Sequence, residues 1–126
     1  MTGYRTDIAG AAAARLPWEK LEDRNILVTG ATGLIGGCLV DILMARRERS
    51  YHVFAAGRDE ERAHARFARY WHDERFHFIK FDVSEPLAGD AVFHYIIHAA
   101  SNASPVFFAK SPVEIIKSNV YGTANL

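Results

Sequence analysis

The chain has 126 residues, of which 49% are hydrophobic and 24% charged, as is typical of one globular domain with its own core. Its 15 Lys and Arg residues balance 15 Asp and Glu residues, so net charge favours neither nucleic acid nor an anionic membrane surface as a partner. The single cysteine, Cys38, excludes an internal disulfide, and no apolar run approaches the ~18 residues of a membrane span. These features predict a cytoplasmic domain.

Residues 1–24 predict a helical segment ahead of this domain. An alanine-rich stretch at 10–14 is flanked by Asp7 and Arg15, and no long apolar run follows it, which argues against a signal peptide. We therefore expect a short N-terminal helix and place the domain proper at 25–126.

Strands and helices alternate from residue 25 onward. Residues 25–29 form a short apolar run that stops at Gly30, typical of a buried strand. An amphipathic helix is predicted from Leu34 to about Arg46, because its apolar residues follow a helical period. Further strands are expected at 52–56, 76–81 and about 92–99, with a helix capped by Asp59 and bearing Ala63, Phe67, Tyr70 and Trp71 on one face, and a last helix opened by Ser111 and Pro112.

This alternation predicts an α/β fold with a doubly wound parallel sheet of four strands in the order 3-2-1-4. The 92–99 strand then lies at an open edge, and no lysine or proline within 93–99 blocks further pairing. Val113, Ile116 and Val120 form an apolar stripe on the last helix. An exposed self-complementary stripe favours a two-fold assembly, so we expect a homodimer or a larger assembly.

A glycine-rich turn lies between the first strand and its helix, at Thr29-Gly30-Ala31-Thr32-Gly33-Leu34-Ile35-Gly36. Gly30 permits a tight turn out of the strand, Gly33 lets the backbone approach a pyrophosphate, and Gly36 lets the helix pack on the sheet. A helix N-terminus also supplies free N–H donors. The spacing Gly-x-x-Gly-x-x-Gly differs from the common Rossmann fingerprint, but its place at this junction predicts a dinucleotide site. A merely tight turn would not explain three glycines here.

The turn resembles the cofactor turn of the extended short-chain dehydrogenase/reductase family, which includes NAD(P)-dependent nucleotide-sugar epimerases and dehydratases. The segments 98–105 and 118–123 are similar to the same family. Within it, Ala100-Ser101-Asn102-Ala103-Ser104-Pro105 most resembles UDP-glucuronate decarboxylases and dTDP-glucose dehydratase relatives. The resemblance covers about residues 25–126 and implies a Rossmann-type fold, an NAD or NADP cofactor and a nucleotide-sugar substrate.

The resemblance also implies which residues contact the cofactor. Backbone groups of Thr32, Gly33, Leu34 and Ile35 would face the pyrophosphate. Asp82 and Val83 would meet the adenine, although Asp82 has the alternative role of a strand-end cap. The small residues Ala99, Ala100 and Ser101 would line the ribose and nicotinamide side, and Asn119 would lie near the cofactor or serve a structural hydrogen bond.

The end of the second strand favours NADP over NAD. Enzymes that use NAD commonly place an acid there to accept from the ribose hydroxyls, whereas this chain has Gly57 followed by Arg58. An arginine can pair with a 2′-phosphate. Two alternatives stay open, since Asp59 can reach the ribose and Arg58 can be a solvated surface residue.

Other patterns do not predict sites. His64, His72 and His77 lack the i, i+4 spacing of a helical metal ligand pair. The basic and aromatic stretch 62–71 is typical of a core face beside a solvated face rather than of a nucleic-acid surface. His98, at the end of a buried strand, is expected to be a structural histidine.

The family resemblance further implies a Tyr-x-x-x-Lys pair that shuttles a proton during hydride transfer. None of the five tyrosines is followed four residues later by lysine. We therefore expect a fragment that binds cofactor without turnover, and the alternative is a stand-alone module that senses NADP(H).

Overall fold

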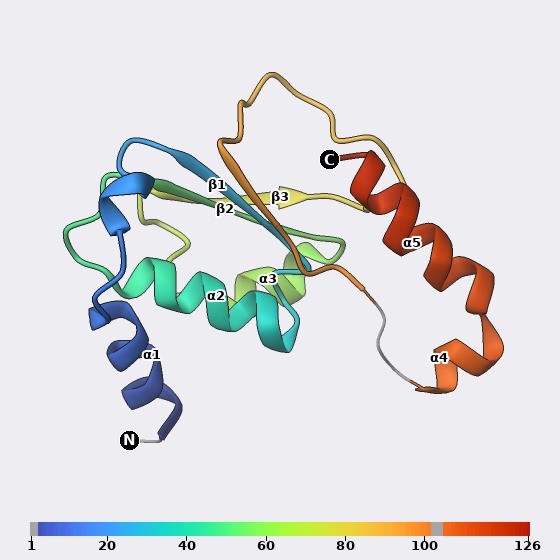
Figure 1. The fold of residues 1–126 in the computed structure, drawn as a ribbon, viewed down its shortest axis with the longest axis horizontal. Coiled ribbons are helices and arrows are strands. Elements are labelled where there is room, and N and C mark those ends of the chain that lie inside the picture. The colour runs from blue at the N-terminus through green and yellow to red at the C-terminus, as the bar shows by residue number, and fades with distance from the viewer. Residues whose placement is uncertain (1–2, 102–104) are drawn as a thin grey trace.

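The computed structural model describes residues 3–101 and 105–126, and its centre is a parallel sheet in the predicted order β3-β2-β1-β4 (Figure 1). The sheet is built from four short strands: β1 (Asn25–Thr29), β2 (His52–Gly57), β3 (Phe76–Lys80) and β4 (Tyr95–His98). Thr29 pairs with Ala56 on one side and with His98 on the other. Because all four strands are parallel, their carboxyl ends meet at one edge of the sheet.

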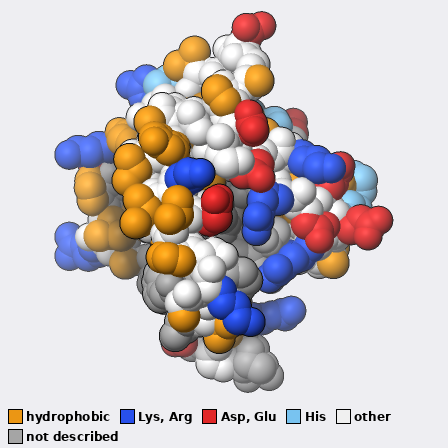
Figure 2. Space-filling view, turned by 90° about the vertical axis from the view of Figure 1, so that its right-hand side faces the viewer, with side chains coloured by type: hydrophobic (Ala, Val, Ile, Leu, Met, Phe, Trp, Pro, Cys, Tyr) orange, Lys and Arg blue, Asp and Glu red, His pale blue; other side chains and the backbone are white. Residues whose placement is uncertain are grey.

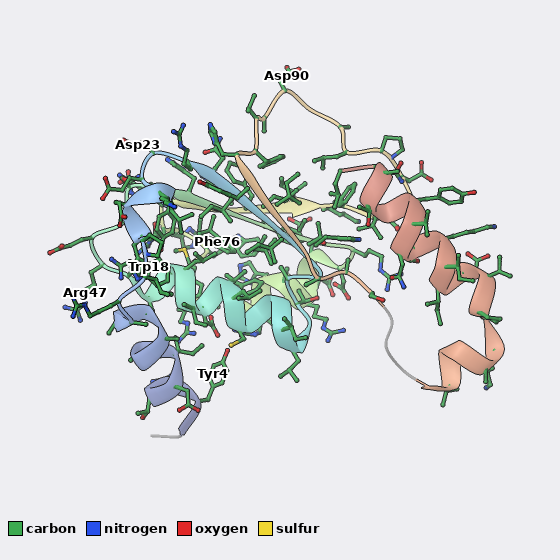
Figure 3. The ribbon with its side chains drawn as sticks, viewed as in Figure 1. Tyr4, Trp18, Asp23, Arg47, Phe76 and Asp90 are labelled. Atoms are coloured by element: carbon green, nitrogen blue, oxygen red, sulfur yellow. The ribbon has the colours of Figure 1, made fainter. Side chains whose placement is uncertain are left out.

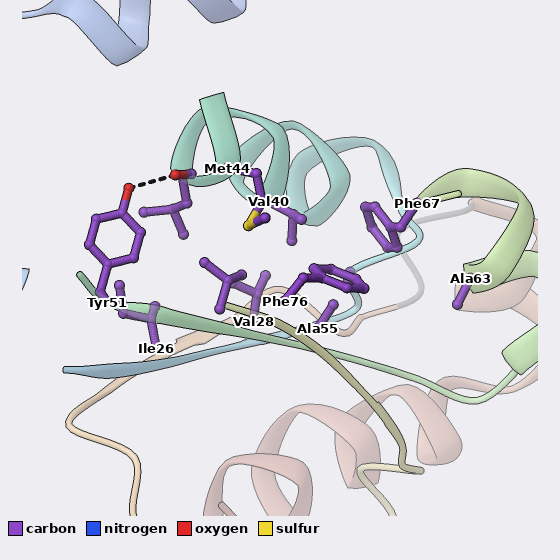
Figure 4. Close-up of a cluster of buried hydrophobic side chains, with 12 residues drawn as sticks. Ile26, Val28, Val40, Met44, Tyr51, Ala55, Ala63, Phe67 and Phe76 are labelled. Carbon is purple, nitrogen blue, oxygen red and sulfur yellow. Dashed lines mark hydrogen bonds between the residues drawn. The ribbon is translucent and has the colours of Figure 1, made fainter. Parts of the chain in front are cut away.

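One face of the sheet packs against α2 (Leu34–Ala45) and α3 (Glu60–Arg66). The core between them is apolar and almost fully buried (Figure 4). Tyr51 donates from its hydroxyl to the Leu43 carbonyl at 2.5 Å, and burial raises the pKa of this phenol to about 12. The core contains twelve buried side chains: Ile26, Val28, Ala31, Val40, Leu43, Met44, Tyr51, Val53, Ala55, Ala63, Phe67 and Phe76.

The N-terminal segment forms α1 (Gly3–Ala13) and a 3-10 turn, η1 (Trp18–Leu21), and α1 lies against the outer side of α2 (Figure 1). Only Ile8 and Ala12 of α1 are buried. Arg46 donates to the Ala12 carbonyl at 2.7 Å and stacks over the Trp18 ring. The predicted lead-in helix is therefore docked on the domain.

The C-terminal helices α4 (Pro105–Lys110) and α5 (Pro112–Ala124) lie beyond the carboxyl ends of the strands (Figure 1). Buried residues of α5 are limited to Ile115 and Gly122. No helix in the described ranges is long and apolar enough to cross a membrane.

Two predicted elements are shorter than expected, and α4 was not predicted. The helix after Asp59 ends at Arg66, and Phe67 to Trp71 lie in turns. The rings of Phe67, Tyr70 and Trp71 all pack against Phe76 at the sheet edge, so the predicted apolar cluster forms although the helix ends before it. The fourth strand is confined to Tyr95–His98.

Candidate functional site

The glycine turn leaves the carboxyl end of β1 and passes close to the end of β4. Gly30 has φ of 62°, and a Cβ there would lie 2.6 Å from the Ala99 carbonyl oxygen. A Cβ at Gly36 would overlap the Gly30 carbonyl. Backbone packing therefore requires glycine at both positions. Gly30 serves the predicted tight turn, whereas Gly36 makes room for the turn backbone rather than for the sheet.

Gly33 is less constrained by packing than these two glycines. It is exposed, its φ of −77° suits any residue, and a Cβ would meet only the Gly30 carbonyl oxygen, at 3.2 Å. The open side of Gly33 fits a group that approaches the backbone from solvent, as a pyrophosphate does.

The N-terminus of α2 adds an electrostatic feature to the same place. Gly33 is the N-cap and makes no side-chain cap hydrogen bond, so the helix presents its first N–H groups and its positive dipole end outward. Leu34 and Ile35 follow and are 89% and 69% exposed. Uncovered apolar side chains beside free N–H donors are suited to an anionic ligand with an organic body.

Strand β4 is joined to the turn by side chains. Thr29 and His98 form a hydrogen bond of 2.7 Å between Oγ1 and Nδ1, and the Ala100 N–H donates to Thr29 Oγ1 at 3.3 Å. The predicted structural role of His98 agrees with this contact, although its buried Nε2 has no hydrogen-bond partner in the described structure. These bonds hold Ala99 and Ala100 beside Gly30. The role of the Thr29 hydroxyl had no signal in the sequence, because its partners lie about 70 residues away.

The structure also brings Ser101 and Asn119 together. The Ser101 hydroxyl donates to Asn119 Oδ1 at 2.8 Å, so the end of β4 is tied to the middle of α5. Both residues were predicted near the cofactor, and both are exposed. The remainder of the motif, residues 102–104, lies outside the described residues.

Arg58, Asp59 and Asp82 lie around the carboxyl ends of β2 and β3. Asp59 accepts from the Arg62 N–H at 3.0 Å and caps α3. Asp82 accepts from the Ser84 N–H at 2.9 Å, the capping contact weighed as its alternative role. This bond and a smaller effect of Arg58 hold the pKa of Asp82 below its usual range. Arg58 itself is exposed, and Val83 contacts α5 near Gly122.

Comparisons with known proteins agree with this fold. The family model for the NAD dependent epimerase/dehydratase family matches residues 26–126. UDP-glucuronic acid decarboxylase 4 of Arabidopsis thaliana is 37% identical over 120 residues, which covers 93% of this chain and 26% of that protein. UDP-glucuronic acid decarboxylase 1 of Danio rerio is 35% identical over 106 residues, covering 82% of this chain and 23% of that protein. The chain thus spans about a quarter of the length of these relatives.

The alignment with the Arabidopsis protein covers 93% of this chain, so it includes part of residues 1–24. The similarity therefore begins before residue 25, where the motifs placed its start. Among solved structures, Pen from Bacillus thuringiensis superposes with a TM-score of 0.66 at 23% identity, over 83% of this chain and 33% of that chain. The terminal R domain of the myxalamid PKS-NRPS pathway superposes with 0.60 at 20% identity, over 95% and 36%. These two likenesses show the fold alone.

Proposed function

Since the chain belongs to the NAD dependent epimerase/dehydratase family, we propose that it is the dinucleotide-binding part of a nucleotide-sugar enzyme of the UDP-glucuronic acid decarboxylase type. The observation that carries the proposal is Gly33, an exposed glycine at a helix N-terminus that no side chain caps. A bound nicotinamide cofactor supplies hydride transfer. The chain's own groups bind and orient it: N–H groups around residues 32–35 at the pyrophosphate, and Ala99, Ala100 and Ser101 at the end of β4.

We propose NADP as the preferred cofactor. Asp59 already accepts a cap hydrogen bond, which leaves it fewer free lone pairs for ribose hydroxyls. Arg58 is exposed at the end of β2 and contributes to lowering the pKa of Asp82, which supports a guanidinium near the proposed adenosine end of the site. A charged hydrogen bond from Arg58 to the 2′-phosphate contributes about 1.5–3 kcal/mol.

Two variants and titration calorimetry test the site and its preference. Gly33→Val should abolish binding of both dinucleotides, because its side chain fills the space of the pyrophosphate, and unchanged affinity would overturn the proposed site. Gly57→Asp should shift preference to NAD by placing an acid at the ribose. A Cβ at Gly57 would make only ordinary contacts, with Phe78 at 3.7 Å and Thr32 at 3.8 Å. Arg58→Ala should remove the NADP preference without creating one for NAD.

Turnover separates this proposal from a cofactor-sensing module. The 126-residue chain contains no Tyr-x-x-x-Lys pair, so we expect it to bind cofactor without converting UDP-glucuronic acid or another nucleotide sugar. A longer polypeptide that carries such a pair downstream should turn over. Binding without turnover in every longer form would favour the sensor.

We also propose a homodimer through α5. Val113, Ile116 and Val120 are 59%, 62% and 59% exposed, and they line a groove of about 250 Å³ with Lys117 and Tyr121. Figure 2 shows hydrophobic side chains gathered on the side of the molecule where α5 lies. A second copy would cover this apolar face by the same helix.

A further inference from the structure

A buried carboxylate, Asp41, lies in the middle of α2 and is separate from the proposed site. Its side chain is 0% exposed. A buried charge is tolerated only where charged or polar donors surround it. The donors here come from α1, α3 and the turn after α3: Asp41 accepts from Tyr4 at 2.6 Å, Arg66 at 2.6 Å, Arg69 at 2.8 Å and Tyr70 at 3.0 Å.

These donors keep Asp41 ionised. Burial raises the pKa of the carboxyl, but the hydrogen bonds from Arg66, Tyr4 and Arg69 outweigh it and leave the pKa below its usual value. Arg66 also donates to the Tyr4 hydroxyl at 3.2 Å, so the carboxylate, the guanidinium and the phenol form a closed triangle. Tyr4 is thereby a polar anchor of α1, in addition to the contact of Arg46 with Ala12, and α1 has little buried apolar surface. Figure 3 shows Tyr4 on the side of α1 toward α2.

The triangle reaches the glycine turn through Arg66. A Cβ at Gly37 would lie 3.0 Å from Arg66 Nη2 and 3.2 Å from the Ala31 carbonyl oxygen. Gly37 therefore lies against both the guanidinium and the backbone of the turn, with little room for a side chain. Its N–H donates to the Gly33 carbonyl at 2.9 Å, and Gly33 is the residue left open for ligand.

We propose that Asp41 is a positioning residue for the dinucleotide turn: it holds Arg66 against Gly37, and it couples the docking of α1 through Tyr4 to nucleotide binding at the turn. The second half of this inference rests on the proposed function. Since coupling between two sites is reciprocal, a bound dinucleotide strengthens the docking of α1, and an undocked α1 weakens dinucleotide binding.

The test uses the whole chain, with Tyr4→Phe, Asp41→Asn and a matched control. Asp73→Asn is the control, because Asp73 pairs with Arg49 at 2.5 Å but contacts neither α1 nor the turn. Tyr4→Phe leaves Asp41 paired with both arginines and should therefore fold. It keeps the test available if Asp41→Asn does not fold. Hydrogen exchange of residues 31–37 without nucleotide is the first readout. We expect faster exchange there in both Asp41 and Tyr4 variants and not in the control.

The second readout is affinity for NADP compared with adenosine 2′-monophosphate, which carries the adenine and the 2′-phosphate but no pyrophosphate. Asp41→Asn should weaken NADP binding on the order of tenfold and Tyr4→Phe about threefold, with affinity for the monophosphate unchanged. If Asp41 had a merely structural role, affinity for the two ligands would change equally when measured well below the melting temperature. NADP should also slow hydrogen exchange in α1 of the wild type.

The outcomes distinguish this inference from the proposed function. Unchanged exchange at residues 31–37 together with unchanged NADP affinity overturns the positioning role while the proposed function stands. If the wild type binds no dinucleotide but the Asp41 and Tyr4 variants show faster exchange at the turn, the positioning role is supported. The proposed function and the coupling are then both overturned.

Discussion

The two faces of the sheet differ in how completely other parts of the chain cover their side chains. On the side covered by α2 and α3, Val28, Val53 and Ala55 are 0% exposed and the core closes on itself (Figure 4). On the other side, Ile96 of β4 is 41% exposed, although its partner Leu27 is 0% exposed. Beyond the carboxyl ends of the strands, the apolar stripe of α5 is more exposed still. Apolar side chains are present on both sides, so the difference lies in which neighbours cover them. The covered side supplies stability, whereas the open side leaves apolar surface on which a partner is proposed.

The largest expected effect tests whether stability resides on the covered side. Phe67→Ala removes a ring that is 0% exposed and should lower the free energy of unfolding by about 3–5 kcal/mol. Ile116→Ala, the matched change on α5, should cost less than about 0.5 kcal/mol in the monomer. Urea unfolding with the same m-value for both variants measures the difference. Similar losses at the two positions would show that α5 is as firmly packed as the core.

A smaller effect is expected from pH on the uncovered face of the sheet. His77 stacks on Phe54 and lies 2.8 Å, nitrogen to nitrogen, from His52. Partial burial and the neighbouring His52 lower the pKa of His77 below 6.5. The unfolded chain therefore binds the proton more readily, so the stabilising contribution of neutral His77 is present above pH 6.5 and is lost as pH falls through the folded pKa.

Unfolding measured between pH 7.5 and 5 should show this loss, below about 1 kcal/mol because the group is partly exposed. His77→Gln should flatten the dependence, and His72→Gln, at an exposed position, should leave it unchanged. A wild type whose stability does not decline over this range would contradict the assignment.

The smallest effect on monomer stability is expected from Ile116→Glu, whose main consequence is on assembly. A charge in the apolar groove of α5 opposes its self-association. Light scattering across a range of protein concentration should give a dimer or larger species for the wild type and a monomer for the variant. A wild type that stays monomeric at high concentration would contradict the proposed dimer and leave the contrast between the two sides intact.

Local patterns in the sequence were sufficient to predict the first elements of the fold and the order of its strands. The apolar run at 25–29, the glycine turn and the helical period after Leu34 predicted β1, the turn and α2 with their observed positions. The alternation of elements predicted the order 3-2-1-4, because right-handed crossovers leave few arrangements of a parallel sheet. The motifs along the chain also predicted the family that the comparisons identified.

Only the tertiary structure decided the contacts between distant side chains. Neither the bond between Thr29 and His98 nor that between Ser101 and Asn119 follows from spacing along the chain. Asp41 occupies an ordinary position in an amphipathic helix, yet packing of α1 and α3 makes it the centre of a buried network. Periodicity reports which face of an element is apolar, whereas a polar contact depends on which other element arrives opposite it, and that is settled when the elements pack.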